Sequence, residues 1–337
     1  MTIVCTRSPP VAPGTSEFGP ESTLPLVTVL TPSFNQRGLL AECLDCVATQ
    51  TYPEVEHIVV DGGSRDGTVE LLQSWATGSR RMFLSEPDGG MYDALNKGLG
   101  LARGELLTYL NCDDLYFPYS LEALVEGWQR TGADVVFGDM VRAYEDGRVV
   151  FKLQPAFDRG FYGFYYQLAQ PTALWTVELA GRLGGFDASL RFGGDADFFL
   201  RAGALGARFA KVDEVVCLER HGAACLSAAH RTQHRGELAA AAARAGVWRG
   251  SAEKAVMGPL RVLRGLARQL ALSASFTRER RLPSAVRWQR FLASGCLDQL
   301  HVGNLLLNVL PAPLLRRKRS AGVLDWGAIQ SAREGEK

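Results

Sequence analysis

The sequence lacks several features that would assign it to a familiar class. Seven cysteines, an odd number, are scattered along 337 residues, which argues against a secreted disulfide framework. No apolar run approaches the ~20 residues that span a bilayer. Residues 7–25 are rich in proline, serine and glycine, where a secretion signal would be apolar. These absences predict a cytoplasmic protein that does not cross the membrane.

Motifs for two large classes of nucleotide-binding enzymes are also missing. The sequence has neither G-x-G-x-x-G nor G-x-x-x-x-G-K-[ST], which disfavours dinucleotide-dependent oxidoreductases and P-loop NTPases. Cys43 and Cys46 form a C-x-x-C pair, but no second pair or histidine pair completes a zinc site. Their position in a predicted helix favours packing in the core. His57, inside a predicted strand, is expected to be structural.

The net charge of +1 conceals a division between the two parts of the chain. Residues 228–337 hold 19 basic and 7 acidic residues and so carry +12, which leaves −11 for residues 1–227. Nucleic-acid binding is disfavoured because the acidic part would repel the phosphates. The basic cluster 316–319 beside the apolar stretch 305–315 fits peripheral contact with an anionic membrane surface, at the inner face of the cell membrane. A helical lid on the rest of the protein fits equally well.

Alternation of apolar runs with amphipathic segments predicts an α/β fold, a doubly wound parallel sheet with helices on both faces. The expected strands are 26–31, 55–61, 82–85, 105–110 and 133–138, and the expected helices include 36–49, 68–77, 91–102 and 119–130. The expected organisation is a flexible lead-in at 1–25, a main domain at 26–230 and a basic helical region at 231–337.

Polar, glycine-rich or acidic residues follow four of these strands, where a doubly wound sheet binds its ligand. The segments are TPSFNQ (31–36), DGGSRDGT (61–68), SEPDGGMYDALNKG (85–98) and NCDD (111–114). Asp113 and Asp114 would repel each other unless a cation compensates. A divalent ion such as Mg²⁺ or Mn²⁺, held partly by ligand phosphates, fits two carboxylates. Two structural alternatives stay open, a helix cap in DGGSRDGT and a turn at the aspartate pair.

In this order and spacing, these motifs resemble the family 2 inverting glycosyltransferases of GT-A fold. The resemblance covers about residues 26–227 and is most specific through residue 114. It implies a GT-A, Rossmann-like, doubly wound mixed sheet with a C-terminal helical appendage. It also implies that a sugar moves from a nucleotide-diphosphate sugar, with UDP as the expected nucleotide, to a hydroxyl of a glycan or lipid-linked acceptor.

The resemblance assigns roles to individual residues of this chain. The residues expected at the nucleotide and donor are Pro32, Phe34, Asn35, Asp61, Asp88, Lys97 and Asp113. Asp114 is expected to bind the metal, and His221 lies where some relatives place a histidine near the metal or phosphate. Gln170 and Trp175 are candidates for the acceptor side, with core packing as the alternative for Trp175.

The segment GGDADFFLR (193–201) resembles the family motif that supplies the catalytic base. Asp195 aligns with that base, and Gly194 stands where many members carry an acid. A helix cap is the structural alternative for Asp195. Asp197 is expected to pair locally with Arg201, four residues on.

Two other functions stay open at this stage. A nucleotidyltransferase would share the topology, but it usually opens with a glycine-rich basic loop, which TPSFNQRG matches poorly. A non-catalytic nucleotide-sugar-binding or scaffold protein of a polysaccharide assembly complex would have no need of a base. The presence of Asp114 together with Asp195 therefore favours the enzyme.

Overall fold

The computed structural model describes residues 2–3, 24–144, 149–152, 154, 157, 168–221 and 230–246. Nearly all of the predicted lead-in and all of the chain beyond 246 lie outside these residues, including the basic and apolar stretches at 305–319. The membrane-contact and lid hypotheses for the C-terminal region therefore stay predictions.

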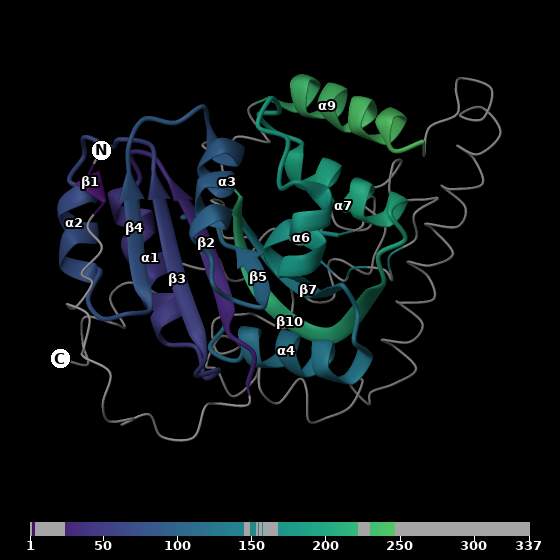
Figure 1. The fold of residues 1–337 in the computed structure, drawn as a ribbon, viewed down its shortest axis with the longest axis horizontal. Helices are drawn as coiled ribbons and strands as arrows, with labels where there is room; N and C mark the ends of the chain where they lie inside the picture. The colour runs from purple at the N-terminus through teal and green to yellow at the C-terminus, as the bar shows by residue number, and fades with distance from the viewer. Residues whose placement is uncertain are drawn as a thin grey trace, which may run out of the picture.

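Ten strands of the described chain form one mixed sheet in the order β1-β4-β3-β2-β5-β9-β7-β10-β6, with β8 paired to β7 (Figure 1). The strands are β1 (Thr2–Ile3), β2 (Val27–Ser33), β3 (Val55–Asp61), β4 (Arg81–Ser85), β5 (Leu106–Tyr109), β6 (Asp114–Tyr116), β7 (Val135–Tyr144), β8 (Val149–Lys152), β9 (Ala173–Thr176) and β10 (Phe209–His221). The helices are α1 (Arg37–Ala48), α2 (Thr68–Trp75), α3 (Met91–Leu101), α4 (Ser120–Thr131), η1 (Gln170–Thr172), α6 (Val177–Leu183), α7 (Gly194–Ala204) and α9 (Arg231–Arg244).

Four of the predicted strands, β2, β3, β4 and β5, lie side by side and run in the same direction. β2 pairs in parallel with both β3 and β5, and β3 pairs in parallel with β4. Ser33 stands opposite Asp61, and Asp61 stands opposite Ser85. The carboxyl ends of β2, β3 and β4 are therefore level, and their polar loops meet at one edge of the sheet. The predicted strands and helices are confirmed here to within a few residues.

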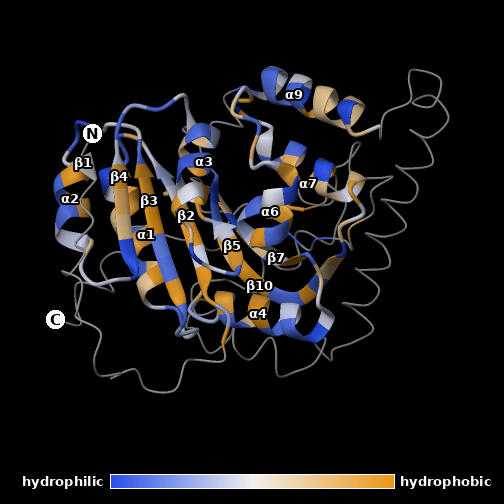
Figure 2. Cartoon of the chain, in the orientation of Figure 1, coloured by the Kyte–Doolittle hydropathy of each residue, from blue (hydrophilic) through white to orange (hydrophobic). Residues whose placement is uncertain are grey.

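The central strands are largely apolar along their length (Figure 2). They present buried apolar side chains to both faces of the sheet, and helices cover both faces. Val29 and Val136 pack with α1 and α4 on one face. Leu30, Ile58 and Phe137 pack with α3, α6 and α7 on the other. The predicted doubly wound α/β sheet is confirmed, and it is mixed because β9 runs antiparallel to β5 and β7.

Helix α9, the first element of the basic region, packs on the main domain. Its residues Ala241 and Ala242, and the C-cap Ala245, belong to the same buried apolar cluster as residues of α3 and α7. The domain boundary at 230 stays a prediction, but α9 itself shares its core with the domain before it. Among the described residues, no helix combines the length and apolar character that crossing a bilayer requires. Cys43 and Cys46 are buried and unbridged in α1, as the core interpretation predicts.

Candidate active site

The loops after β2 and β3 are tied together by paired hydrogen bonds. The backbone N–H of Asn35 donates to the Ser64 hydroxyl at 2.7 Å, and the backbone N–H of Arg65 donates to the Asn35 side-chain oxygen at 2.9 Å. Asn35 has φ of 51°, a left-handed conformation that asparagine tolerates better than most residues. The pairing explains why the chain holds asparagine at this turn, and it makes the two loops one unit.

Asp61 is the centre of this edge. Its side chain is fully buried, and its carboxylate accepts hydrogen bonds from the backbone N–H groups of Gly63 and Ser64 at 3.1 and 2.9 Å. The hydroxyls of Ser64 and Ser85 also donate to it. A carboxylate with these donors holds the loop after β3 and ties it to the end of β4. The loop after β2 is linked to it indirectly, through the hydrogen bond from Asn35 to Ser64. The predicted nucleotide contact of Asp61 stays a prediction.

Phe34 and Asp88 flank Gly62 at the same edge. A Cβ placed on Gly62 would lie 2.9 Å from Asp88 Oδ2 and 3.1 Å from Phe34 Cδ2, so a side chain at this position would have to displace one of them. Phe34 is 60% exposed, the largest exposure among the described large apolar side chains. The carbonyl oxygen of Pro32 in β2 accepts from the Cys112 thiol at 3.2 Å. An exposed ring beside a carboxylate is a surface suited to a flat base and a hydroxylated sugar.

The loop after β4 is held by its own acidic residues. Asp88 accepts from the backbone N–H of Gly90 at 2.8 Å, and Asp93 accepts from that of Gly89 at 2.9 Å. Burial raises the pKa of Asp88. Lys97 lies 3.0 Å from Glu86 and 3.4 Å from Asp93, so it neutralises this loop from α3.

Asp113 ends the loop from β5 to β6, and Asp114 is the first residue of β6, which pairs with β10. Asp114 is buried and stands opposite Glu219 in the β6–β10 ladder. Burial, and then the charge of Glu219, raise the pKa of Asp113. Arg142 pairs with Glu219, and Arg220 pairs with Glu42. Burial and the neighbouring negative charge disfavour the ionised form of Asp113, and a bound cation would offset both effects.

The chemistry of these side chains fits a divalent cation that binds together with a diphosphate. Carboxylate oxygens are the ligands that Mg²⁺ and Mn²⁺ prefer. Among the described residues, no three histidine, cysteine, aspartate or glutamate side chains lie close enough together to form a metal site. Asp114 and His221 are therefore not part of such a group of three. His221 ends β10, with its ring 5.2 Å from that of Tyr144. A site with one or two protein carboxylates requires the remaining ligands to come from the donor.

Asp195 and Asp197 lie in the first turn of α7 and have different surroundings. Asp197 is 2% exposed and pairs with Arg201 at 2.6 Å and with Arg244 of α9 at 2.9 Å. The predicted local pairing of Asp197 is confirmed. Asp195 instead faces Tyr92 of α3: its backbone N–H donates to the Tyr92 hydroxyl at 3.3 Å, and its Oδ1 lies 3.5 Å from the same oxygen.

Two contributors near α7 were missed by sequence reasoning. Tyr92 lies within the motif SEPDGGMYDALNKG, but nothing in the motif distinguishes its ring from core packing. Glu237 of α9 accepts backbone N–H bonds from Arg191, Phe192 and Gly193, at 3.2, 2.8 and 2.9 Å. It thereby fixes the turn that leads into Asp195, across 40 residues or more of sequence, and no local pattern reports such a contact.

Two predicted acceptor-side residues are structural. Trp175 is 1% exposed and packs among Tyr109, Phe186 and Phe198. Gln170 is 2% exposed and donates to the backbone carbonyl of Tyr109 at 2.5 Å. Both belong to the core, so the acceptor hypothesis for them is wrong in this structure.

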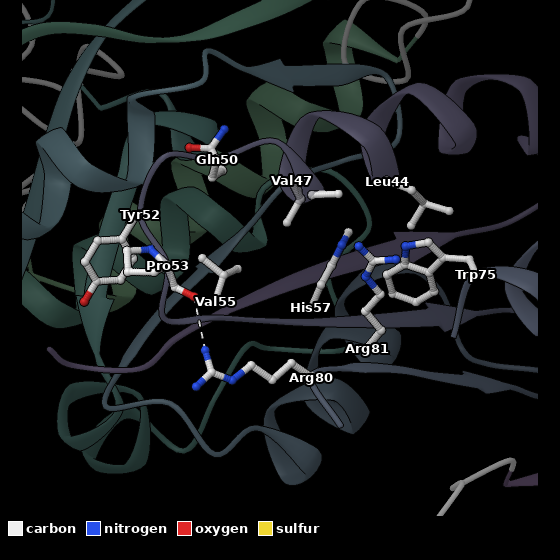
Figure 3. Close-up of a pocket in the computed structure, with 11 residues that line it drawn as sticks. Leu44, Val47, Gln50, Tyr52, Pro53, Val55, His57, Trp75, Arg80 and Arg81 are labelled. Atoms are coloured by element: carbon white, nitrogen blue, oxygen red, sulfur yellow. Dashed lines mark hydrogen bonds between the residues drawn. The ribbon is translucent and has the colours of Figure 1, made fainter. Parts of the chain in front are cut away.

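A pocket of about 370 Å³ lies at the opposite end of the sheet, where β3 and β4 begin (Figure 3). His57 lines it and hydrogen-bonds Thr31 at 2.9 Å, with its ring 5.1 Å from that of Trp75. Burial, and then the charge of Arg81, lower the pKa of His57 to about 3, so it stays neutral. These contacts agree with the structural role expected for His57. The polar loops lie at the other end of β3.

Comparison with known proteins agrees with this geometry. The model of the family described as glycosyl transferase family 2 matches residues 28–188. The PGL/p-HBAD biosynthesis glycosyltransferase Rv2957 of Mycobacterium tuberculosis is 30% identical over 181 residues, which are 52% of this chain and 69% of that protein.

Two solved structures share the fold. The mannosyltransferase PcManGT from Pyrobaculum calidifontis superposes with a TM-score of 0.54 at 23% identity, over 88% of this chain and 89% of its own. S. aureus TarS superposes with a TM-score of 0.50 at 20% identity, and the match covers 58% of this chain but only 37% of TarS. The GT-A fold expected from the sequence motifs is thereby confirmed.

The family match also decides between the enzyme classes left open by the sequence. Its residues 28–188 include all four polar loops at the carboxyl edge of the sheet. The relative matched over two thirds of its length is itself a glycosyltransferase. The nucleotidyltransferase alternative therefore has no support. The chain belongs to family 2 of the glycosyltransferases and is a transferase enzyme of GT-A fold.

Proposed function

We propose that the protein moves a sugar from a nucleotide-diphosphate sugar to a hydroxyl of a glycan or lipid-linked acceptor, with inversion at the anomeric carbon. The observation that carries this proposal is the contact between Tyr92 and Asp195. Tyr92 is the second residue of α3, which begins where the loop 85–90 ends. The contact thus brings a carboxylate from a distant part of the chain next to the helix that follows the donor loop.

The donor is bound by the polar loops in this proposal. Pro32, Phe34 and Asn35 border the nucleotide, with the exposed Phe34 ring available to a base. Asp61 holds the loops in place, and Asp88 with Lys97 lies beside the sugar and phosphates. PcManGT was solved in complex with GDP-Man and Mn²⁺, which supports a nucleotide-sugar donor. UDP and GDP are the two nucleotides to compare, and UDP is the one that the sequence motifs favour.

The acidic residues supply the rest of the reaction. Asp114 would hold a divalent cation together with the donor diphosphate, with His221 as a candidate second ligand, and Asp113 would contact the ribose of the donor. When bound, the cation offsets the negative charge that develops on the departing diphosphate. Asp195 accepts the proton of the acceptor hydroxyl while the oxygen of that hydroxyl forms a bond to the anomeric carbon. The bond from that carbon to the diphosphate breaks, and nucleoside diphosphate leaves.

The test compares two neighbouring aspartates and measures donor binding beside turnover. Asp195→Asn should retain nucleoside diphosphate binding in calorimetry, while transfer or donor hydrolysis falls by the ~10²–10⁴ typical of losing a general base. Asp197→Asn is the matched control and should chiefly lower stability, because its carboxylate is buried in ion pairs. An active Asp195→Asn enzyme would refute the assignment of the base.

The cation is tested separately at the aspartate pair. Asp114→Asn should abolish turnover and weaken donor binding chiefly when Mn²⁺ or Mg²⁺ is present. Normal metal-dependent turnover in this variant would mean that NCDD is not the cation site. If the wild-type protein binds a nucleotide sugar with Mn²⁺ and never releases nucleoside diphosphate, the transferase proposal itself fails.

A further inference from the structure

The side chain of Tyr92 is held rigidly between α3 and α7. Its ring is 2% exposed and stacks on Phe186 with a centroid distance of 5.9 Å and an angle of 26° between the planes. The ring also packs against Gly194, where a Cβ would lie 2.7 Å from two ring atoms. Because the ring has no room to move, the direction of its hydroxyl is fixed by the fold.

The hydroxyl meets Asp195 at two points. It accepts the backbone N–H of Asp195 at 3.3 Å and lies 3.5 Å from the carboxylate oxygen Oδ1. Burial, and then the charge of Asp195, raise the pKa of Tyr92 well above 10. The phenol therefore keeps its proton at working pH. The Tyr92 oxygen already accepts the backbone N–H of Asp195, so the hydroxyl is free to donate its own proton to Oδ1.

The same packing explains why residue 194 is a glycine. The sequence has glycine at this position, where many family members carry an acid, and the sequence alone offers no reason for the exchange. The Tyr92 ring fills the space that any side chain at 194 would need. The tyrosine and the missing acid are thus two parts of one local arrangement, which has Tyr92 as the neighbour of Asp195.

We infer that Tyr92 is the positioning residue of the transfer reaction, and that its hydroxyl orients the Asp195 carboxylate and favours its ionised form. This inference rests on the proposed function, in which Asp195 is the base. A hydrogen bond donated to a carboxylate stabilises its charge. The geometry would tighten when the donor and acceptor are bound, as contacts in unliganded active sites commonly do.

Among the residues that the structure describes, the charged side chains that act on the Tyr92 hydroxyl are Asp195 of α7 and Glu237 of α9. Glu237 is engaged with the backbone N–H groups of residues 191–193. Removal of the Tyr92 hydroxyl should therefore change the titration of Asp195 more than that of any other group at the site.

The experiment is Tyr92→Phe in the full-length protein, which removes one oxygen and keeps the ring. The assay follows nucleoside diphosphate release from UDP-glucose and from GDP-mannose with Mn²⁺, using whichever supports turnover. We expect kcat to fall about tenfold, the value of one hydrogen bond, with the KM for donor unchanged. The acidic limb of the kcat–pH profile should move to higher pH, because the ionised base loses its donor.

The matched control is Tyr52→Phe. Tyr52 is also buried, and its hydroxyl donates to the carbonyl of Pro25 at 2.5 Å, at the far end of the sheet. This variant should lose stability and keep both kcat and the pH profile. Replacement of Tyr92 by 3-fluorotyrosine, a stronger hydrogen-bond donor of nearly the same shape, should move the acidic limb the opposite way. This second variant keeps the test decisive if Tyr92→Phe folds poorly.

The outcomes separate this inference from the proposed function. If Asp195→Asn is inactive while Tyr92→Phe has wild-type kcat and pH profile, the positioning role is refuted and the proposed base stands. If Asp195→Asn retains turnover, the base assignment fails, and the positioning role fails with it. A lower kcat with an unmoved pH profile in both Tyr92 variants would reduce Tyr92 to a packing residue.

Discussion

A single methyl group at Gly194 should disrupt the start of α7. A Cβ at this position would lie 2.7 Å from Tyr92 Cε2, 2.7 Å from Cζ and 2.8 Å from Cδ2. Carbon atoms in good contact lie about 3.5 Å apart or more, so the ring and the helix must separate by about 0.8 Å. The ring cannot yield easily because it is 2% exposed and also stacks on Phe186.

The cost of Gly194→Ala follows from this overlap. Forcing an extra carbon into a packed core typically costs about 1–3 kcal/mol, and alanine returns at most about 1 kcal/mol through its better helix propensity. A net loss of about 1–2 kcal/mol should lower the melting temperature by about 2–8 °C in a domain of this size. Turnover should also fall, because the displaced ring carries its hydroxyl away from Asp195.

The assay is thermal unfolding followed by the donor-hydrolysis rate, with Gly181→Ala as the control. Gly181 lies inside α6, and a Cβ there would meet nothing within 4 Å. That substitution should leave stability unchanged or slightly raised. A Gly194→Ala protein that melts at the wild-type temperature with wild-type kcat would refute the packing of Tyr92 against α7. In a Tyr92→Ala background, Gly194→Ala should cost nothing further, because the obstacle is gone.

Two other side chains allow direct tests. Glu237→Gln should lose about 1.5–3 kcal/mol of stability and reduce turnover, because the Glu237 carboxylate holds the backbone of residues 191–193. Glu178→Gln, at an exposed position of α6, is the control. Equal melting temperatures of these two variants would contradict the role of Glu237. Burial raises the pKa of Asp139 to about 6, so its folded form binds a proton more tightly than its unfolded form. Wild type should therefore gain stability relative to Asp139→Asn as pH falls from 7 to 4.5. If the unfolding free energies of the two proteins change with pH in parallel, the raised pKa of Asp139 is refuted.

The sequence predicted the sheet because each strand is apolar on both faces. Val29 and Leu30 point to opposite faces and both are buried, so the strand appears in the sequence as a continuous apolar run. That pattern determines which segments are strands. It does not determine their order, and the antiparallel insertion of β9 between β5 and β7 has no local signature.

Ligand-facing loops were predictable for a related reason. Parallel strands end at the same edge, so polar residues after successive strands must converge. The contacts that organise α7 are different, because they come from residues that are individually ordinary. Glu237 looks like any acidic residue in an alanine-rich helix, and only the folded chain brings it to the backbone of residues 191–193.

Asp61 shows the limit of reasoning from strand ends. An aspartate after a buried strand is expected both when a loop needs an anchor and when a ligand needs an acceptor, and the two requirements produce the same sequence. In the structure the carboxylate has donors from Gly63, Ser64 and Ser85, so its anchoring role alone accounts for its burial. A ligand that reaches Asp61 must share or displace one of those donors. The loop after β3 and the end of β4 would then respond together, because Asp61 joins them, and the loop after β2 would follow through the hydrogen bond from Asn35 to Ser64.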